Sequence, residues 1–110
     1  MKQGEIWYAD LNPATGSEQT GFRPILIVSG NMLNEHLKVV IAMPITTKIK
    51  NYKGNLVLQP DAQNGLTQES EVLSFHIRSI SKERLKRRIG KISKRDLQEL
   101  IESLNDILRY

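Results

Sequence analysis

An uninterrupted apolar run, Ile25-Leu26-Ile27-Val28, constrains the fold of this chain more than any other feature of its sequence. The run follows Arg23-Pro24, and the proline favours extended backbone at the arginine, so a strand is expected at residues 24–29. A strand with one face in water alternates apolar and polar residues, whereas this one does not. Both of its faces must therefore be covered, and Arg23 lies where a polar loop enters the buried strand.

Five more short strands and one terminal helix complete the predicted fold. The strands are expected at residues 5–11, 37–45, 55–60, 71–75 and 88–92, with irregular connections at 30–36 and 77–80 and a short helical turn at 81–85. Apolar residues recur at helical spacing from Leu97 to Leu108, and Ser93 is placed to cap that helix. This pattern predicts one α+β domain over residues 1–110, a small SH3-like antiparallel β-barrel or half-barrel with a C-terminal amphipathic helix.

Composition excludes several classes of protein. Of the 110 residues, 39% are hydrophobic and 25% are charged, which is ordinary for a globular domain. No apolar stretch is long enough to span a bilayer and the start has no signal-peptide pattern, so we expect a cytoplasmic protein without a membrane partner. The chain has no cysteine, and His36 and His76 have no histidine or carboxylate at the spacing of metal ligands, so neither a metal nor a cofactor is expected.

Basic residues are concentrated in one segment, residues 78–95. This segment holds nine lysines and arginines against the single acid Glu83, whereas the remainder of the chain is net acidic. Such an asymmetry predicts a polyanionic partner, RNA or DNA, or else an acidic protein. A solvated face that is basic for solubility is the simpler alternative, and the charge pattern alone leaves both open.

Arg23 is preceded by a polar loop that has a glycine near each end. The glycines, Gly16 and Gly21, let the backbone fold back over a surface or swing away from it. The guanidinium of Arg23 stays charged and presents a planar fork of donors that matches the oxygens of a phosphate. An ion pair of Arg23 with Glu18 or Asp10 is the structural alternative, and the sequence leaves it open.

A second group of polar residues ends the strand expected at 37–45. Thr46 and Thr47 follow that strand, and three lysines come next, at positions 48, 50 and 53. A threonine hydroxyl beside an arginine can bond a second oxygen of a phosphate whose charge grows in a transition state. A turn stabilised by the threonine hydroxyls is the alternative.

Several short motifs occur in an order and spacing that resemble one protein family. They are Gly-Glu-Ile-Trp at 4–7, Gly-Ser-Glu-Gln at 16–19, Arg-Pro-Ile-Leu-Ile-Val-Ser at 23–29, Pro-Ile-Thr-Thr-Lys at 44–48, Gly-Leu at 65–66, Ser-x-Val-Leu at 70–73 and Ile-Arg-Ser-Ile at 77–80. Each motif is weak by itself, but the set is specific. From about residue 4 to the final helix, the chain resembles the MazF/PemK family of toxin endoribonucleases from type II toxin-antitoxin systems.

The resemblance implies a CcdB/PemK-type fold, a homodimer, and cleavage of single-stranded RNA at short sequence motifs without a metal ion. In this family the ribose 2′-hydroxyl attacks the adjacent phosphate and leaves a 2′,3′-cyclic phosphate and a 5′-hydroxyl. The resemblance also implies a cognate antitoxin whose acidic, largely disordered tail lies across the dimer and blocks RNA.

Roles for individual residues follow from the same resemblance. By position, Arg23 is the family's catalytic arginine and Thr46 its catalytic threonine. The residues expected to contact RNA are Ser17, Gln19, Thr47, Lys48, Lys50, Lys53 and Arg78. The segments 12–22 and 48–54 are the candidates for base recognition.

Proton transfer needs a further group, because an arginine with a pKa above ~12 is a poor general base. Glu18 and His76 are the candidate acid and base. Some family members carry an arginine and an acid where this chain has Leu73 and Phe75, and many have glutamine at the position of His76. Catalysis through that second pair is therefore not available here.

Two functions from other classes compete with the nuclease. One is a CcdB-like poison of DNA gyrase, which shares the small barrel and cleaves nothing. The other is a non-catalytic RNA-binding barrel that holds phosphates with its lysines and basic segment. The combination of Arg23, Thr46 and the polar loop at 16–19 favours the nuclease.

Overall fold

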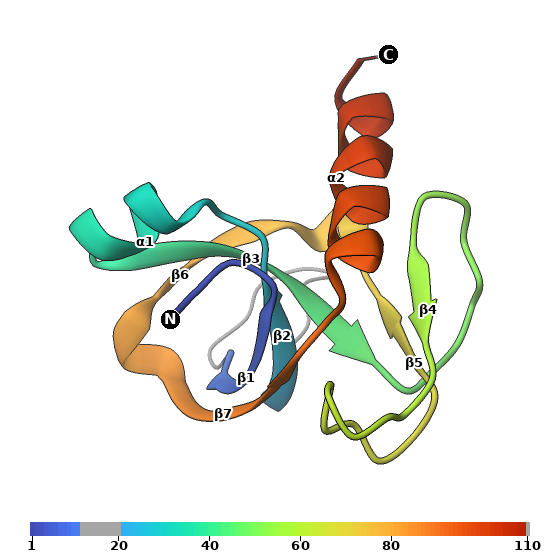
Figure 1. The fold of residues 1–110 in the computed structure, drawn as a ribbon, viewed down its shortest axis with the longest axis horizontal. Coiled ribbons are helices and arrows are strands. Elements are labelled where there is room, and N and C mark those ends of the chain that lie inside the picture. The colour runs from blue at the N-terminus through green and yellow to red at the C-terminus, as the bar shows by residue number, and fades with distance from the viewer. Residues whose placement is uncertain (12–20, 110) are drawn as a thin grey trace.

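The computed structural model describes residues 1–11 and 21–109, which form one strongly bent antiparallel sheet with helices packed around it (Figure 1). The elements in chain order are β1 (Glu5–Asp10), β2 (Phe22–Ile27), α1 (Asn31–His36), β3 (Val39–Thr46), β4 (Leu56–Leu58), β5 (Ser70–Val72), η1 (Ser74–His76), β6 (Arg78–Ser81), η2 (Lys82–Arg84), β7 (Leu85–Lys91) and α2 (Lys94–Arg109). The strand order is β4-β5-β3-β2-β1-β7, and β6 also pairs with β3. The predicted α+β class is confirmed, with a half-barrel that stays open because β6 and β7 are not paired in the described residues.

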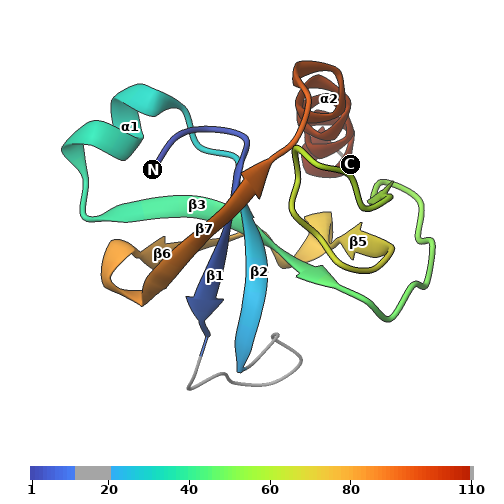
Figure 2. The same ribbon diagram turned by 60° about the horizontal axis from the view of Figure 1, so that its bottom comes forward.

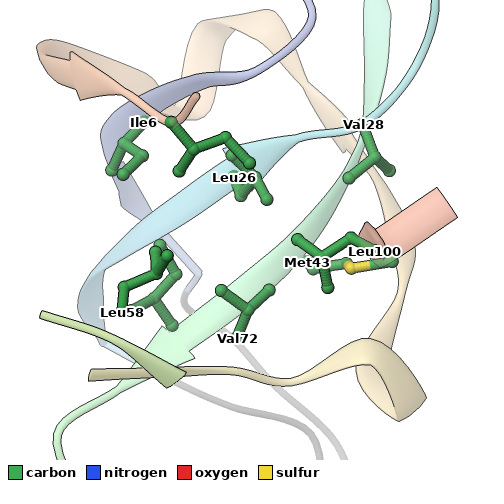
Figure 3. Packing of buried hydrophobic residues seen from close by; sticks show 9 residues of the cluster. Ile6, Leu26, Val28, Met43, Leu58, Val72 and Leu100 are labelled. Atoms are coloured by element: carbon green, nitrogen blue, oxygen red, sulfur yellow. The ribbon is translucent and has the colours of Figure 1, made fainter. Parts of the chain in front are cut away.

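Strand β2 is covered on both faces, as its unbroken apolar run predicts. Leu26 and Val28 belong to a buried cluster that also contains Leu100 of α2 (Figure 3). Ile25 and Ile27 belong to a second buried cluster, to which β1, β3, β6 and β7 contribute. The alternation of side chains along a strand sends neighbouring residues to opposite faces, so this one strand anchors both halves of the core.

Helix α2 confirms the prediction from helical periodicity. Ser93 caps it, since the Ser93 hydroxyl oxygen accepts a hydrogen bond from the Asp96 backbone N–H at 3.1 Å. Leu100 is buried against the sheet, whereas Leu108 near the helix end is 71% exposed. In Figure 1 the helix rises away from the sheet. Neither helix in the described residues combines the length and apolar character needed to cross a membrane.

The connection expected at 30–36 is instead a short helix, α1. Its Asn34 is buried, and the side-chain amide of Asn34 donates to the carbonyl oxygen of Ser29 at 2.9 Å. The hydroxyl oxygen of Ser29 in turn accepts the backbone N–H of Ile41 at 3.0 Å. These tertiary contacts hold a six-residue helix that is too short to be predicted from periodicity.

The strand boundaries also differ from the predictions, and the strands expected at 37–45 and 55–60 are Val39–Thr46 and Leu56–Leu58. The strand expected at 71–75 ends at Val72, because the backbone N–H of Ser74 donates to the Asn55 side chain at 2.9 Å and turns the chain into η1. The step expected at 77–80 is strand β6, with Arg78 opposite Ala42 of β3. The last strand begins at Leu85 rather than residue 88, since Leu85 and Arg87 also pair with β1, opposite Ala9 and Tyr8.

The loop at Asn64-Gly65 packs closely against β7. Gly65 has a φ of +68°, and a Cβ there would lie 2.4 Å from the carbonyl oxygen of Ile89. On the facing strand, a Cβ on Gly90 would lie 2.4 Å from the carbonyl oxygen of Gln63. Only glycine fits at both positions, and the contact fixes the 61–67 loop beside β7.

Candidate functional site

Arg23 and Thr46 lie together because β2 pairs with β3. The register sets Ile25 opposite Pro44 and Ile27 opposite Ala42, and continued two residues outward it sets Arg23 opposite Thr46. Figure 2 shows β2 running beside β1 toward one end of the sheet. At that end both residues line a hollow of about 310 Å³, together with Phe22, Pro24, Ile45, Thr47 and Ser70. The two residues that the sequence singled out therefore share one site.

The hydroxyl of Thr46 stabilises a turn, which is one of the two alternatives that the sequence left open. Its oxygen accepts the backbone N–H of Lys48 at 3.1 Å, and the residue is only 7% exposed. A hydroxyl has one hydrogen to donate and two lone pairs, so this bond leaves the hydrogen for another acceptor. The turn thus fixes the position of a hydroxyl donor at the wall of the hollow.

Ser70 is a residue of this site that sequence reasoning missed. Strand β5 pairs with β3 so that Glu71 is opposite Thr46, and Ser70 therefore follows beside Thr47. Its hydroxyl donates to the carbonyl oxygen of Gln68 at 2.8 Å. The Ser-x-Val-Leu motif contains Ser70, but only the pairing of β5 with β3 brings it to the hollow.

Glu71, also missed, organises the neighbouring loop from a fully buried position. One carboxylate oxygen accepts the backbone N–H groups of Lys50 at 2.6 Å and Asn51 at 2.9 Å. The other accepts the N–H of Tyr52 at 3.0 Å and the side-chain amide of Asn55 at 2.9 Å. Burial alone would raise the pKa of Glu71, but these hydrogen bonds, the one from Asn55 foremost, outweigh it and hold the pKa below its ordinary value.

The lysines that follow Thr46 are divided between two places. Lys48 is tied to Thr46 at the edge of the hollow, and the backbone of Lys50 is tied to Glu71. Lys53 instead lines a separate hollow beside α2, with Ser103, Asp106 and Ile107. The backbone of Lys48 therefore stays beside Thr46, whereas the loop that Glu71 anchors brings Lys53 to the helix.

The remaining predicted site residues do not line the hollow of Arg23 and Thr46. His76 ends η1 and is half-buried, and Arg78 begins β6 opposite Ala42. Neither is among the described residues that line the hollow. Ser17, Glu18 and Gln19 lie outside the described residues.

The basic segment 78–95 is partly structural. Lys82 donates to the carbonyl oxygen of Asn34, and Lys86 to that of Glu83 at 2.9 Å. Arg88 forms an ion pair with Glu5 at 3.0 Å. Lys91, Lys94 and Arg95 are exposed, so the segment both braces the fold and presents positive charge to solvent.

Comparison with known proteins assigns the family. A family model described as PemK-like, MazF-like toxin of type II toxin-antitoxin system matches residues 2–108, and the chain belongs to this family. It is 37% identical over 109 residues to the Endoribonuclease MazF9 of Mycobacterium tuberculosis (strain ATCC 25618 / H37Rv), covering 94% of this chain and 92% of that protein.

Solved structures agree in fold. The crystal structure of MazF from Deinococcus radiodurans matches with a TM-score of 0.86 and 26% identity, over 100% of this chain and 97% of that chain. A crystal structure of MazE-MazF from the same organism matches with a TM-score of 0.79 and 27% identity, over 98% of this chain and 95% of that chain. The half-barrel with its terminal helix is therefore the MazF fold.

Proposed function

We propose that this chain is the endoribonuclease toxin of a type II toxin-antitoxin system and cuts single-stranded RNA at short sequence motifs without a metal ion. The observation that carries the proposal is the shared hollow of Arg23 and Thr46 at the end of the sheet. Membership of the MazF/PemK family and the likeness to a protein named as an endoribonuclease support the same activity.

The proposed reaction is an intramolecular transesterification at the phosphodiester. The ribose 2′-oxygen forms a bond to the adjacent phosphorus while the bond from phosphorus to the 5′-oxygen breaks. A base takes the proton of the 2′-hydroxyl, and an acid gives a proton to the leaving 5′-oxygen, which leaves a 2′,3′-cyclic phosphate and a 5′-hydroxyl. The Arg23 guanidinium and the Thr46 hydroxyl would bond the phosphate oxygens as their negative charge grows.

Glu18 and His76 are the proposed groups for the two proton transfers. His76 lies apart from the hollow in this chain, and Glu18 lies outside the described residues. The pH dependence of cleavage by Glu18→Gln and His76→Gln separates them, because loss of an essential acid or base removes one limb of the profile.

We also propose the partners that the family implies. Ser17, Gln19, Thr47, Lys48, Lys50, Lys53 and Arg78 are the proposed RNA contacts. The protein would act as a cytoplasmic homodimer and be blocked by an antitoxin with an acidic tail. The MazE-MazF complex of Deinococcus radiodurans supports an antitoxin partner, and the exposed Lys91, Lys94 and Arg95 are suited to an acidic tail.

The test is incubation of the protein with a long single-stranded RNA in excess EDTA, followed by mapping of the 5′ ends. We expect discrete cuts with 5′-hydroxyl ends from the wild type. Arg23→Ala and Thr46→Val should each lower the rate by about 10²-fold or more, as for the loss of one transition-state donor. Arg109→Ala, which removes an exposed arginine at the end of α2, is the matched control and should cut normally.

Intact RNA from a correctly folded wild-type protein would contradict the proposal and favour the gyrase poison or the binding module. A pure RNA binder would give another pattern, in which Arg23→Ala lowers affinity modestly and no cut appears with either protein.

A further inference from the structure

A row of three side chains crosses the sheet beside the hollow of Arg23 and Thr46. The ring of Tyr8 on β1 is stacked with that of Phe22 on β2, with centroids 6.3 Å apart and planes at 15°. The guanidinium of Arg87 on β7 lies 5.8 Å from the centroid of the Tyr8 ring. Because β1 lies between β7 and β2, the arginine and the phenylalanine flank Tyr8 from opposite sides.

Phe22 is the open end of this row. It is 57% exposed, at the outer end of a strand that becomes fully buried from Ile25 to Ile27. It also lines the hollow that contains Arg23 and Thr46. The row therefore ends on an aromatic surface at the wall of the proposed cleavage site.

A second hollow, of about 380 Å³, lies against two members of the row, Tyr8 and Arg87. Arg88 and Ile89 of β7 and Gly65 and Leu66 of the loop packed against β7 also line it. Pro24 lines this hollow as well as the hollow of Arg23 and Thr46, so the two adjoin. A ligand bound at Arg23 and Thr46 can therefore extend along the row.

The position of Arg87 is set by the pairing of β7 with β1, which also places Arg88 beside Glu5. Arg88 is held by Glu5, whose other carboxylate oxygen accepts the indole N–H of Trp7 at 2.9 Å. Residues directly opposite each other in an antiparallel pair lie on the same face of the sheet, so Arg87 meets the ring of Tyr8. The arrangement is thus built into the pairing of β7 with β1, where Tyr8 is opposite Arg87.

We propose that the row Arg87, Tyr8 and Phe22, with its hollow, is a nucleobase-binding subsite that holds one base of the RNA next to the phosphate bound by Arg23 and Thr46. This inference rests on the proposed function and adds the side chains that bind a base of the substrate. An aromatic ring stacks on any base, and an arginine against the ring stack adds cation–π attraction. An acidic peptide suits the row less well, because the face of an aromatic ring carries negative partial charge.

Phe22→Leu tests the subsite, since it keeps an apolar side chain and removes the ring. Loss of one base–aromatic stack lowers affinity by about 5- to 100-fold. Phe22→Trp keeps a ring and should bind like the wild type. Phe75→Leu is the matched control, because Phe75 is 50% exposed and its ring lies 6.0 Å from that of Tyr52.

The decisive measurement combines Phe22→Leu with a modified RNA. A short RNA that carries the mapped cut site is protected by a 2′-O-methyl group at the cut nucleotide, and its bases are removed one at a time. We expect the wild type to lose affinity most at one position beside the cut. Removing the base at that position should not weaken RNA binding by Phe22→Leu any further. Phe75→Leu should lose affinity at the same positions, and by the same factors, as the wild type.

Equal losses in the wild type and Phe22→Leu at every position would overturn the subsite. So would a Phe22→Leu protein that binds RNA normally but binds poly-glutamate more weakly, since the row would then receive an acidic peptide. If the wild type cuts no RNA, the proposed function fails separately. The subsite is then judged by the affinities of Phe22→Leu and Phe75→Leu for oligoadenosine, where an effect confined to Phe22→Leu supports it and equal affinities overturn it.

Discussion

Replacing Glu71 by glutamine should lower the free energy of unfolding and release the loop that carries Lys48 and Lys50. The carboxylate accepts four hydrogen bonds, two at each oxygen, from a fully buried position. Glutamine has nearly the same shape but only one oxygen. Its amide nitrogen would face two donors, so two bonds are lost whichever way the amide is turned.

The expected cost follows from the bonds that are lost. A hydrogen bond to a charged group contributes about 1.5 to 3 kcal/mol, so two of them amount to about 3 to 6 kcal/mol. The backbone N–H groups of residues 50–52 belong to an exposed loop and can form hydrogen bonds with water instead. The lower end of this range of energies is therefore expected. We expect a loss of about 3 kcal/mol at pH 7, which in a chain of this size lowers Tm by about 10 °C.

The assay is urea and thermal denaturation of the wild type, Glu71→Gln and the control Glu69→Gln, an exposed acid two residues away. Because the folded-state pKa of Glu71 lies below its ordinary value, the stabilisation is full above the unfolded pKa of ~4.3. It is lost as the pH falls through the folded pKa. The gap between the wild type and Glu71→Gln should therefore shrink below about pH 4.

The reasoning about Glu71 fails if Glu71→Gln stays within about 1 kcal/mol of the wild type at pH 7, below the cost of one charged hydrogen bond. It fails equally if the gap is the same at low pH, because the effect would then not depend on the ionised carboxylate. Glu69→Gln should be nearly neutral throughout.

Two further predictions concern the loop beside β7 and the lysine beside Thr46. Gly65→Ala should lower the free energy of unfolding by about 2 kcal/mol or more, because φ is +68° and the new Cβ would meet the Ile89 carbonyl. The control Gly30→Ala places its Cβ in open space and should leave the stability unchanged. Equal stabilities of the two variants in chemical denaturation would contradict the prediction. Lys48→Gln should reduce the slope of log affinity against log salt for single-stranded RNA by about 0.7, one phosphate contact, whereas Lys38→Gln at the other end of β3 should leave it unchanged. An unaltered slope for Lys48→Gln would remove that lysine from the RNA contacts.

The sequence predicts those elements whose own residues carry a complete signal. Helix α2 has a full apolar stripe and a capping serine. Strand β2 has an unbroken run of apolar residues. Helix α1 has neither feature, since it is held by the buried Asn34 and its contacts to Ser29. Strand β6 was not predicted because its pairing partner, β3, lies more than thirty residues away in the chain.

Some residues of the candidate site could likewise be predicted from the sequence, and others could not. Arg23 and Thr46 could be predicted because each follows or precedes a buried strand and each belongs to a motif. Glu71 could not, because an acid in a short strand gives no sign that four donors will gather around it. The row Arg87, Tyr8 and Phe22 comes from three strands, and its members form no pattern along the chain.

By itself the sequence determined the fold class, the family, the terminal helix and the two residues at the centre of the proposed site. These depend on local periodicity, capping and ordered motifs, which the chain carries wherever it folds. The tertiary structure decided which side chains share a hollow, which basic residues brace the fold, and where Phe22 presents its ring. Those outcomes depend on the register of strands distant in sequence, and a shift of one residue would send each side chain to the other face.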